Sequence, residues 1–231
     1  MSKSFGKSLS KPLIGIVPYN MLRTDKCDIG ANYIEYDYVD SLKKSGAEVI
    51  GLLTASEDDL YSEEMLKMCD GFLIHGGDNH KAYHLQVVDY AYKNNKPLFG
   101  VCLGMQLVGL YSSNKPFRKI TDCYENALDH APKLSGKSDV SKSVHDIFIE
   151  KESCLYKLFG EKIGLNSRHI ECVTEIGEQF MITARSADGV AEMLEYKYDD
   201  KFILCVQGHP ENMGCWKPAF DLFVSKVKSF M

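Results

Sequence analysis

A cysteine flanked by glycines stands between two apolar segments, in the run Gly100-Val101-Cys102-Leu103-Gly104. Residues 97–101 predict a strand, and the apolar residues after Cys102 predict a helix. Glycines on both sides of Cys102 permit a sharp strand-to-helix turn in which a Cβ would clash. At a helix start, free backbone N–H groups and the helix dipole favour the nucleophilic thiolate and can bind an oxyanion. The pattern indicates a nucleophile elbow, although a buried structural cysteine fits the same residues.

A histidine that could activate this thiol follows the last predicted strand. The apolar run 201–207 ends in Gly208-His209-Pro210-Glu211. His209 and Glu211 are two residues apart on an extended segment, so both side chains can reach the same side. The histidine can then act as base to the thiol while the carboxylate orients its ring. A surface turn made by these residues is the alternative interpretation.

A pair of glycines at the end of another strand offers backbone donors. The apolar segment 71–74 is followed by His75-Gly76-Gly77-Asp78. Considered alone, these glycines indicate a plain turn. Because the elbow also places glycine where a strand stops, one N–H group from each loop can converge on a single oxyanion. We therefore favour a role for both loops in one site.

Strands and helices alternate in the first half of the chain, as in a parallel sheet whose functional residues gather at the carboxyl ends of the strands. We expect strands at 12–18, 47–53, 71–74, 97–101, 117–121, 144–149, 181–184, 191–196 and 201–207, and helices at 32–45, 59–68, 81–94, 153–159 and 217–229. Residues 126–143 predict a mobile surface loop near the site. Residues 1–11 predict a flexible tail on a single domain that spans residues 1–231.

Composition narrows the class of protein. The 231 residues are 45% hydrophobic and carry a formal net charge of −5 without a long like-charge block, so a nucleic-acid partner is not expected. The eight cysteines are dispersed, without C-x-x-C pairs. Neither a secretory signal nor a run of about 18 apolar residues is evident, so we expect no membrane association and a cytoplasmic location.

The elbow run 100–106 and the later run 206–211 together resemble the class I glutamine amidotransferase superfamily. The resemblance covers nearly the whole chain. It implies an α/β fold, a three-layer sandwich with a mostly parallel central sheet of the flavodoxin-like type. Residues 12–19, 76–78 and 166–169 look most similar to the γ-glutamyl-γ-aminobutyrate hydrolase-like branch, peptidase C26.

Three positions depart from that branch. An arginine commonly follows the nucleophile there, whereas this chain has Leu103, as in ammonia-donating glutaminases. Ile170 replaces the usual second histidine of the 166–169 segment. Gly208 replaces the usual aromatic residue before the catalytic histidine. These differences bear on the substrate more than on the chemistry.

The resemblance implies roles for particular residues. Cys102, His209 and Glu211 would form a catalytic triad, and the backbone of Gly77 and Leu103 would form the oxyanion hole. The implied substrate-binding residues are Gly76, Gln106, Asn166, Ser167, Arg168 and His169. The implied reaction is thiolate attack on a γ-glutamyl amide, release of the amine with a proton from His209, and hydrolysis of the thioester. This chemistry requires neither a metal nor a cofactor, and none is expected.

Alternatives remain open. In the first interpretation the chain hydrolyses a small γ-glutamyl conjugate without a partner, and Arg168 suits an anionic leaving amine. In the second it is the glutaminase subunit of an amidotransferase and delivers ammonia to a separate synthase. A non-catalytic member of the fold is disfavoured because all three triad residues are present. His80 and His84 lie four residues apart and could bind a metal, but without a third ligand nearby a solvated helix face is favoured.

Overall fold

A computed structural model describes residues 11–23 and 29–231 of the chain. Its strands are β1 (Leu13–Val17), β2 (Tyr19–Arg23), β3 (Ile29–Tyr33), β4 (Glu48–Gly51), β5 (Gly71–Ile74), β6 (Leu98–Val101), β7 (Arg118–Lys119), β8 (His145–Ile149), β9 (Lys162–Leu165), β10 (Glu171–Cys172), β11 (Phe180–Ser186), β12 (Ala191–Tyr196) and β13 (Ile203–Val206). Its α-helices are α1 (Tyr36–Lys44), α2 (Glu63–Met68), α3 (Ala82–Lys93), α4 (Leu103–Ser113), α5 (Lys137–Val140), α6 (Tyr156–Phe159) and α7 (Lys217–Ser229). Short 3-10 helices occupy Ile120–Asp122, Pro210–Asn212 and Gly214–Trp216.

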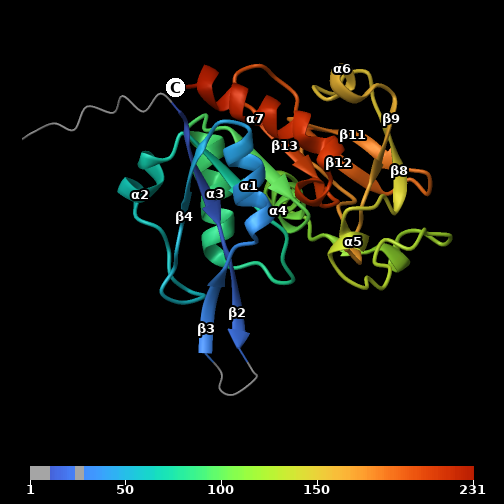
Figure 1. The fold of residues 1–231 in the computed structure, drawn as a ribbon, viewed down its shortest axis with the longest axis horizontal. Coiled ribbons are helices and arrows are strands. Elements are labelled where there is room, and N and C mark those ends of the chain that lie inside the picture. Colours follow the sequence, from blue (N-terminus) through green and yellow to red (C-terminus); the bar gives the residue numbers. More distant parts are fainter. Residues whose placement is uncertain (1–10, 24–28) are drawn as a thin grey trace, which may run out of the picture.

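A nine-stranded sheet in the order β4-β1-β5-β6-β13-β12-β11-β8-β9 organises the molecule. The strands from β4 to β13 pair in parallel. The strands from β13 to β9 pair antiparallel. Figure 1 shows α1 and α7 on one face of the parallel part and α3 and α4 on the other. This arrangement confirms the expected α/β sandwich, and the antiparallel strands extend it.

Alternation along the central strands fills a core on each face. In β5, Leu73 packs in the cluster beneath α1 and α7, whereas Phe72 and Ile74 pack in the cluster beneath α3 and α4. Successive strand residues point to opposite faces, so a strand covered on both sides is apolar throughout. The apolar stripe of α7 supplies the first cluster through Phe220, Phe223, Val224 and Val227.

Two predicted helices begin four residues later than expected, and the helix predicted at 153–159 begins only at Tyr156. The helix predicted at 32–45 covers only Tyr36–Lys44, because the preceding residues form strand β3 of a hairpin with β2. Asn32 holds that strand in place, since its amide donates to the Thr54 carbonyl and accepts from the Thr54 N–H at 2.8 and 3.1 Å. The helix predicted at 59–68 begins at Glu63 and not at Asp59. Its cap is the Ser62 hydroxyl, which accepts from Met65 N at 3.2 Å.

Two further expectations also need correction. The strand predicted at 117–121 is reduced to Arg118–Lys119, which pair with β10 and lead into a 3-10 helix. The segment predicted as the mobile loop 126–143 contains helix α5 and the buried His130. The predicted tail lies largely outside the described residues. No helix in the described ranges is long and apolar enough to cross a membrane.

Candidate active site

Cys102 stands at a strained turn between β6 and α4. Its backbone has φ 52° and ψ −104°, a region that non-glycine residues rarely adopt. A Cβ at Gly100 would lie 2.8 Å from the Gly104 carbonyl carbon, and a Cβ at Gly104 would lie 2.3 Å from the Ile74 oxygen. Both glycines are therefore required for this turn. Leu103 is the first residue of α4, where backbone N–H groups have no acceptor within the helix.

The parallel pairing of β6 and β13 brings the predicted base to the thiol. Val101 lies opposite Val206, and Cys102 N donates to the Val206 carbonyl at 2.8 Å. The chain continues from β13 to His209, whose ring packs with Cys102 against Gly76 and interacts electrostatically with the cysteine. His209 Nδ1 lies 2.8 Å from Glu211 Oε1. The structure thus brings the cysteine, histidine and glutamate together in the expected order.

Electrostatics in this group favour a protonated histidine. Burial of His209 opposes the charged form, but the Glu211 carboxylate and the Cys102 sulfur outweigh burial and raise the pKa of His209 to about 9. An imidazolium beside the sulfur stabilises the thiolate, which is the form that attacks a carbonyl. Cys102 is 6% exposed, so the residue is nearly enclosed.

The glycine loop after β5 packs directly against this group. A Cβ at Gly76 would lie 2.6 Å from His209 Cε1 and 3.3 Å from Cys102 Cβ. A Cβ at Gly77 would lie 3.4 Å from Leu103 Cδ2. The two loops expected to form the oxyanion hole are therefore neighbours at the carboxyl ends of adjacent strands.

Tyr38 joins the histidine to the glycine loop, a role that the sequence does not reveal. Its hydroxyl accepts from Gly76 N and lies near His209 Nδ1, both at 3.3 Å. The side chain is fully buried and stacks on His75 at 5.1 Å between ring centroids. The sequence has three tyrosines near α1 without a sign of which one turns inward, and Tyr36 is 89% exposed.

The predicted substrate-binding segment 166–169 packs beside the triad, but three of its side chains are buried and bonded within the protein. Asn166 Oδ1 accepts from His209 N at 2.8 Å, and its amide donates to Val140 O at 2.6 Å. The Ser167 hydroxyl donates to His130 O at 2.6 Å. His169 lies 3.2 Å from a ring nitrogen of His130. These side chains hold the segment in place.

Two more predicted contact residues are also engaged. Gln106 on α4 donates its amide to the Glu171 carbonyl at 3.0 Å. Arg168, which is partly exposed, donates to Glu211 Oε1 at 3.3 Å and to Asn212 Oδ1 at 3.1 Å. The guanidinium therefore lies on the triad carboxylate, and its contact with a leaving group stays a prediction.

Gly208 precedes His209 for a steric reason. A Cβ at this position would lie 2.3 Å from the Asn166 oxygen and 2.5 Å from Leu165 Cγ. The aromatic residue expected from the resemblance would not fit against this backbone. Gly208 thus allows Leu165 and the backbone of Asn166 to pack directly against this position.

The fold and the relatives together show that this chain is a member of the class I glutamine amidotransferase-like superfamily. The chain belongs to the Peptidase C26 family, whose profile matches residues 12–84 and 79–211.

A glutamine amidotransferase-like protein of Lactococcus lactis is 30% identical over 129 residues, which are 56% of this chain and 52% of that protein. The chain thus matches about half the length of that relative. A glutamine amidotransferase-like protein of Rickettsia prowazekii is 23% identical, with 95% of this chain and 98% of that protein covered. A solved structure from Thermoplasma acidophilum, described as one subunit of GMP synthase, superposes with a TM-score of 0.65 at 17% identity. That match covers 95% of this chain and 96% of the other.

Proposed function

We propose that this chain is a cysteine-dependent hydrolase that cleaves the γ-glutamyl amide bond of a small conjugate to glutamate and a free amine. One observation carries the proposal: Cys102 stands at a strained elbow, His209 packs with it against Gly76, and His209 Nδ1 lies 2.8 Å from Glu211 Oε1. Amide hydrolysis through an acyl-enzyme needs a nucleophile, a proton carrier and a group that orients the carrier. Membership of the Peptidase C26 family supports this type of C–N bond cleavage.

In the proposed mechanism the Cys102 thiolate attacks the γ-carbonyl carbon and forms a tetrahedral intermediate. The N–H groups of Gly77 and Leu103 would bind its oxyanion. His209 then transfers its proton to the departing nitrogen, and the C–N bond breaks to leave a thioester on Cys102. The neutral His209 next takes a proton from water, whose oxygen attacks the thioester and releases glutamate. The thiolate and the imidazolium are thereby restored.

One nine-stranded sheet runs through the described part of the chain, with a large buried cluster packed against each of its two faces. We therefore propose that the chain acts as a single domain.

The experiment is hydrolysis by the purified chain alone, with glutamine compared against a panel of neutral and acidic γ-glutamyl amides. Cys102→Ala provides the blank, and Cys215→Ala provides the matched control because Cys215 is an exposed cysteine outside the triad. We expect faster release from a conjugate than from glutamine, and a preference for acidic amides would support a contact with Arg168. Equal release by the Cys102→Ala variant would refute the proposal.

A second candidate function is the glutaminase subunit of an amidotransferase with a separate synthase. The likeness to the Thermoplasma protein described as part of GMP synthase favours it, as does Leu103 after the nucleophile. In that case the chain alone would cleave only glutamine, or nothing until a synthase was added. The same panel separates the two functions.

A further inference from the structure

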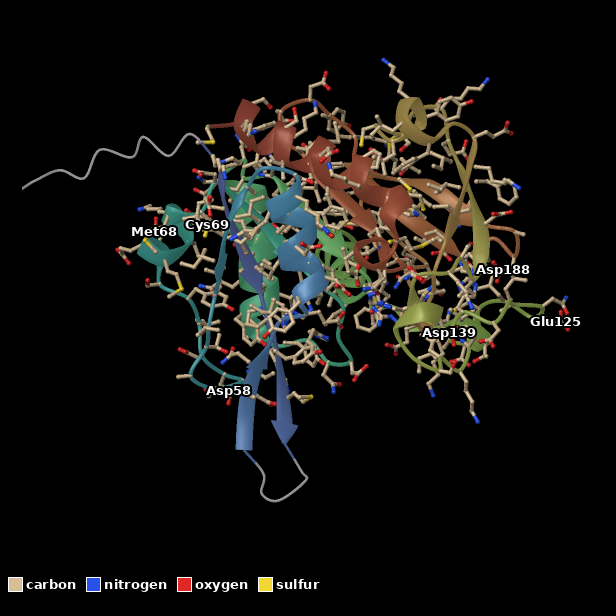
Figure 2. All side chains as sticks on the ribbon, viewed as in Figure 1. Asp58, Met68, Cys69, Glu125, Asp139 and Asp188 are labelled. Carbon is tan, nitrogen blue, oxygen red and sulfur yellow. The ribbon has the colours of Figure 1, made fainter. Side chains whose placement is uncertain are left out.

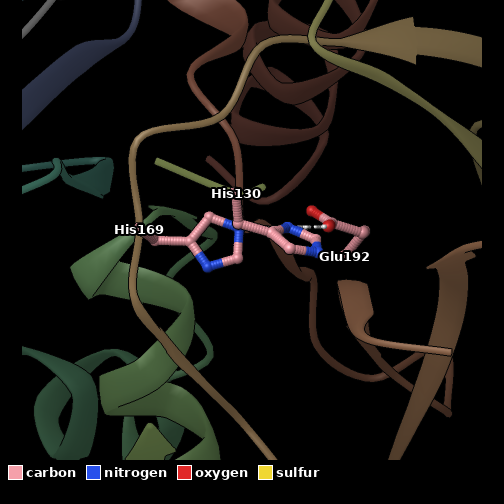
Figure 3. A group of neighbouring side chains, drawn as sticks. All are labelled: His130, His169 and Glu192. Carbon is pink, nitrogen blue, oxygen red and sulfur yellow. Dashed lines mark hydrogen bonds and ion pairs between the residues drawn. The ribbon is translucent and has the colours of Figure 1, made fainter. Parts of the chain in front are cut away.

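Three buried side chains of types that can bind a metal ion meet at the 166–169 segment. His130 comes from the segment before α5, His169 from the segment after β9, and Glu192 from β12. Their exposures are 3%, 4% and 0%, and their candidate ligand atoms all lie within 4.8 Å of one another. Figure 3 shows the three side chains converging from separate parts of the chain. Side chains this polar are seldom fully buried unless paired or bound to an ion.

The distances among the three atoms fit one coordination sphere. His130 Nδ1 lies 3.2 Å from His169 Nε2 and 3.2 Å from Glu192 Oε1. His169 Nε2 lies 3.9 Å from the same carboxylate oxygen. Ligands about 2.0–2.1 Å from a tetrahedral zinc ion are roughly 3.3 Å apart. A small divalent cation would therefore fit among these atoms with only slight adjustment.

The opposite nitrogen of each imidazole already has an acceptor. His130 Nε2 lies 2.9 Å from Asp188 Oδ2, and His169 Nδ1 lies 3.0 Å from the Glu171 carbonyl. Figure 2 marks Asp188 on the side of the molecule where β8 and α5 lie. With these nitrogens facing outward, the second nitrogen of each ring points toward the other ring and toward the Glu192 carboxylate. Metal-binding histidines are oriented by such outer partners.

Several neighbouring polar groups lack a hydrogen bond within the described part of the chain, although Glu192 Oε1 lies within ion-pair distance of His130 and His145. Neither oxygen of Glu192 has a partner there in hydrogen-bond geometry, although His145 Nε2 lies 3.0 Å from Oε1. Both nitrogens of His145 and both amide atoms of Gln207 are likewise buried without a hydrogen bond to any described residue. Gln207 N donates to the Glu192 carbonyl, so these two residues are opposite each other in the sheet. Orphaned polar atoms around three converging ligands are expected where a cation belongs.

We propose that His130, His169 and Glu192 bind a divalent cation of the zinc class, with His145 or water as the fourth ligand. Two imidazoles and one carboxylate suit zinc, which accepts nitrogen and oxygen ligands in a tetrahedral site. The cation is structural. It fastens the segment that carries His130 and the segment that carries His169 to the central sheet. The proposal does not depend on the hydrolase assignment.

The test uses the full-length chain without a histidine tag. Metal is removed by dialysis against a chelator, one equivalent of zinc or cobalt is added, and bound metal is counted by mass spectrometry after desalting. We expect about one equivalent in the wild type and at least a tenfold loss of affinity in Glu192→Gln and His169→Ala. His80→Ala is the matched control because His80 is an exposed histidine on another segment, and it should bind like the wild type.

Cobalt spectroscopy keeps the test decisive if a variant fails to fold. Tetrahedral nitrogen and oxygen ligation gives visible d–d bands without a thiolate charge-transfer band in the near ultraviolet. Zinc should also raise the melting temperature of the wild type in a concentration-dependent way, as a ligand of the native state does. Failure of the wild type to take up either metal would overturn the proposal in favour of a proton shared among the three groups. A thiolate band, or equal uptake by Glu192→Gln, would overturn it in favour of a site elsewhere.

Discussion

Gly76→Ala tests whether the glycine loop sets the position of the catalytic histidine. The added Cβ would lie 2.6 Å from His209 Cε1, so the ring must retreat by about 0.8 Å to restore an ordinary 3.4 Å contact. The ring has little freedom to do so, because Glu211 holds Nδ1 at 2.8 Å. A misplacement of about 1 Å in a catalytic group costs roughly a hundredfold in rate. We expect a loss of kcat of that order.

The assay is amide hydrolysis under saturating substrate, supported by the rate at which iodoacetamide alkylates Cys102. Gly214→Ala is the matched control, because a Cβ there meets no described residue within 4 Å and Gly214 lies close to the triad in the chain. Circular dichroism should show both variants folded. Activity of Gly76→Ala within threefold of the wild type would show that the ring tolerates the methyl group and that the loop does not position it.

Two further predictions concern His209 and its supports. Because the pKa of His209 is raised to about 9, its imidazolium and the associated stability are fully present below pH 6.5 and are lost as the pH rises through about 9. The value of kcat/KM should fall as the pH rises through about 9, and Glu211→Gln should move this fall to lower pH. An unchanged alkaline side of the pH profile in the variant would exclude His209 as the group whose titration causes the fall. Asn166→Ala removes the acceptor of His209 N and should cost about 1–3 kcal/mol in urea unfolding. Asn212→Ala, which changes a partly exposed amide, should cost less; equal costs would contradict the special role of Asn166.

Elements with a strong periodic pattern were predictable from the sequence. The helix 217–229 matches α7 at both ends, since its apolar residues repeat at helical spacing and Pro218 stands near its start. The elbow was predictable because a strained turn with close backbone packing demands glycines at fixed positions around Cys102. The pairing of His209 with Glu211 was predictable because the two residues are close in sequence. The extended segment from which it was predicted is wrong, since Pro210–Asn212 forms a 3-10 helix.

Contacts between distant segments were not predictable in this way. Tyr38 and His209 are 171 residues apart, and nothing in the local pattern around α1 indicates that this tyrosine turns toward the histidine. His130 lies in a polar stretch that resembles a surface loop, so its sequence neighbours indicate no role for it. Its burial depends on Asp188 and Glu192, which reach it only after β11 and β12 have paired. Residue type and spacing carry little information about such long-range partners.

Strand β13 connects the two sites. It pairs in parallel with β6, which leads into Cys102, and antiparallel with β12, which carries Glu192. Gln207 therefore lies opposite Glu192, and His209 follows two residues later beside Cys102. The 166–169 segment also links the two sites, because Asn166 Oδ1 accepts from the His209 backbone N–H while His169 faces Glu192. A cation at the cluster would thus restrain the two segments that position the catalytic histidine, without taking part in the reaction itself.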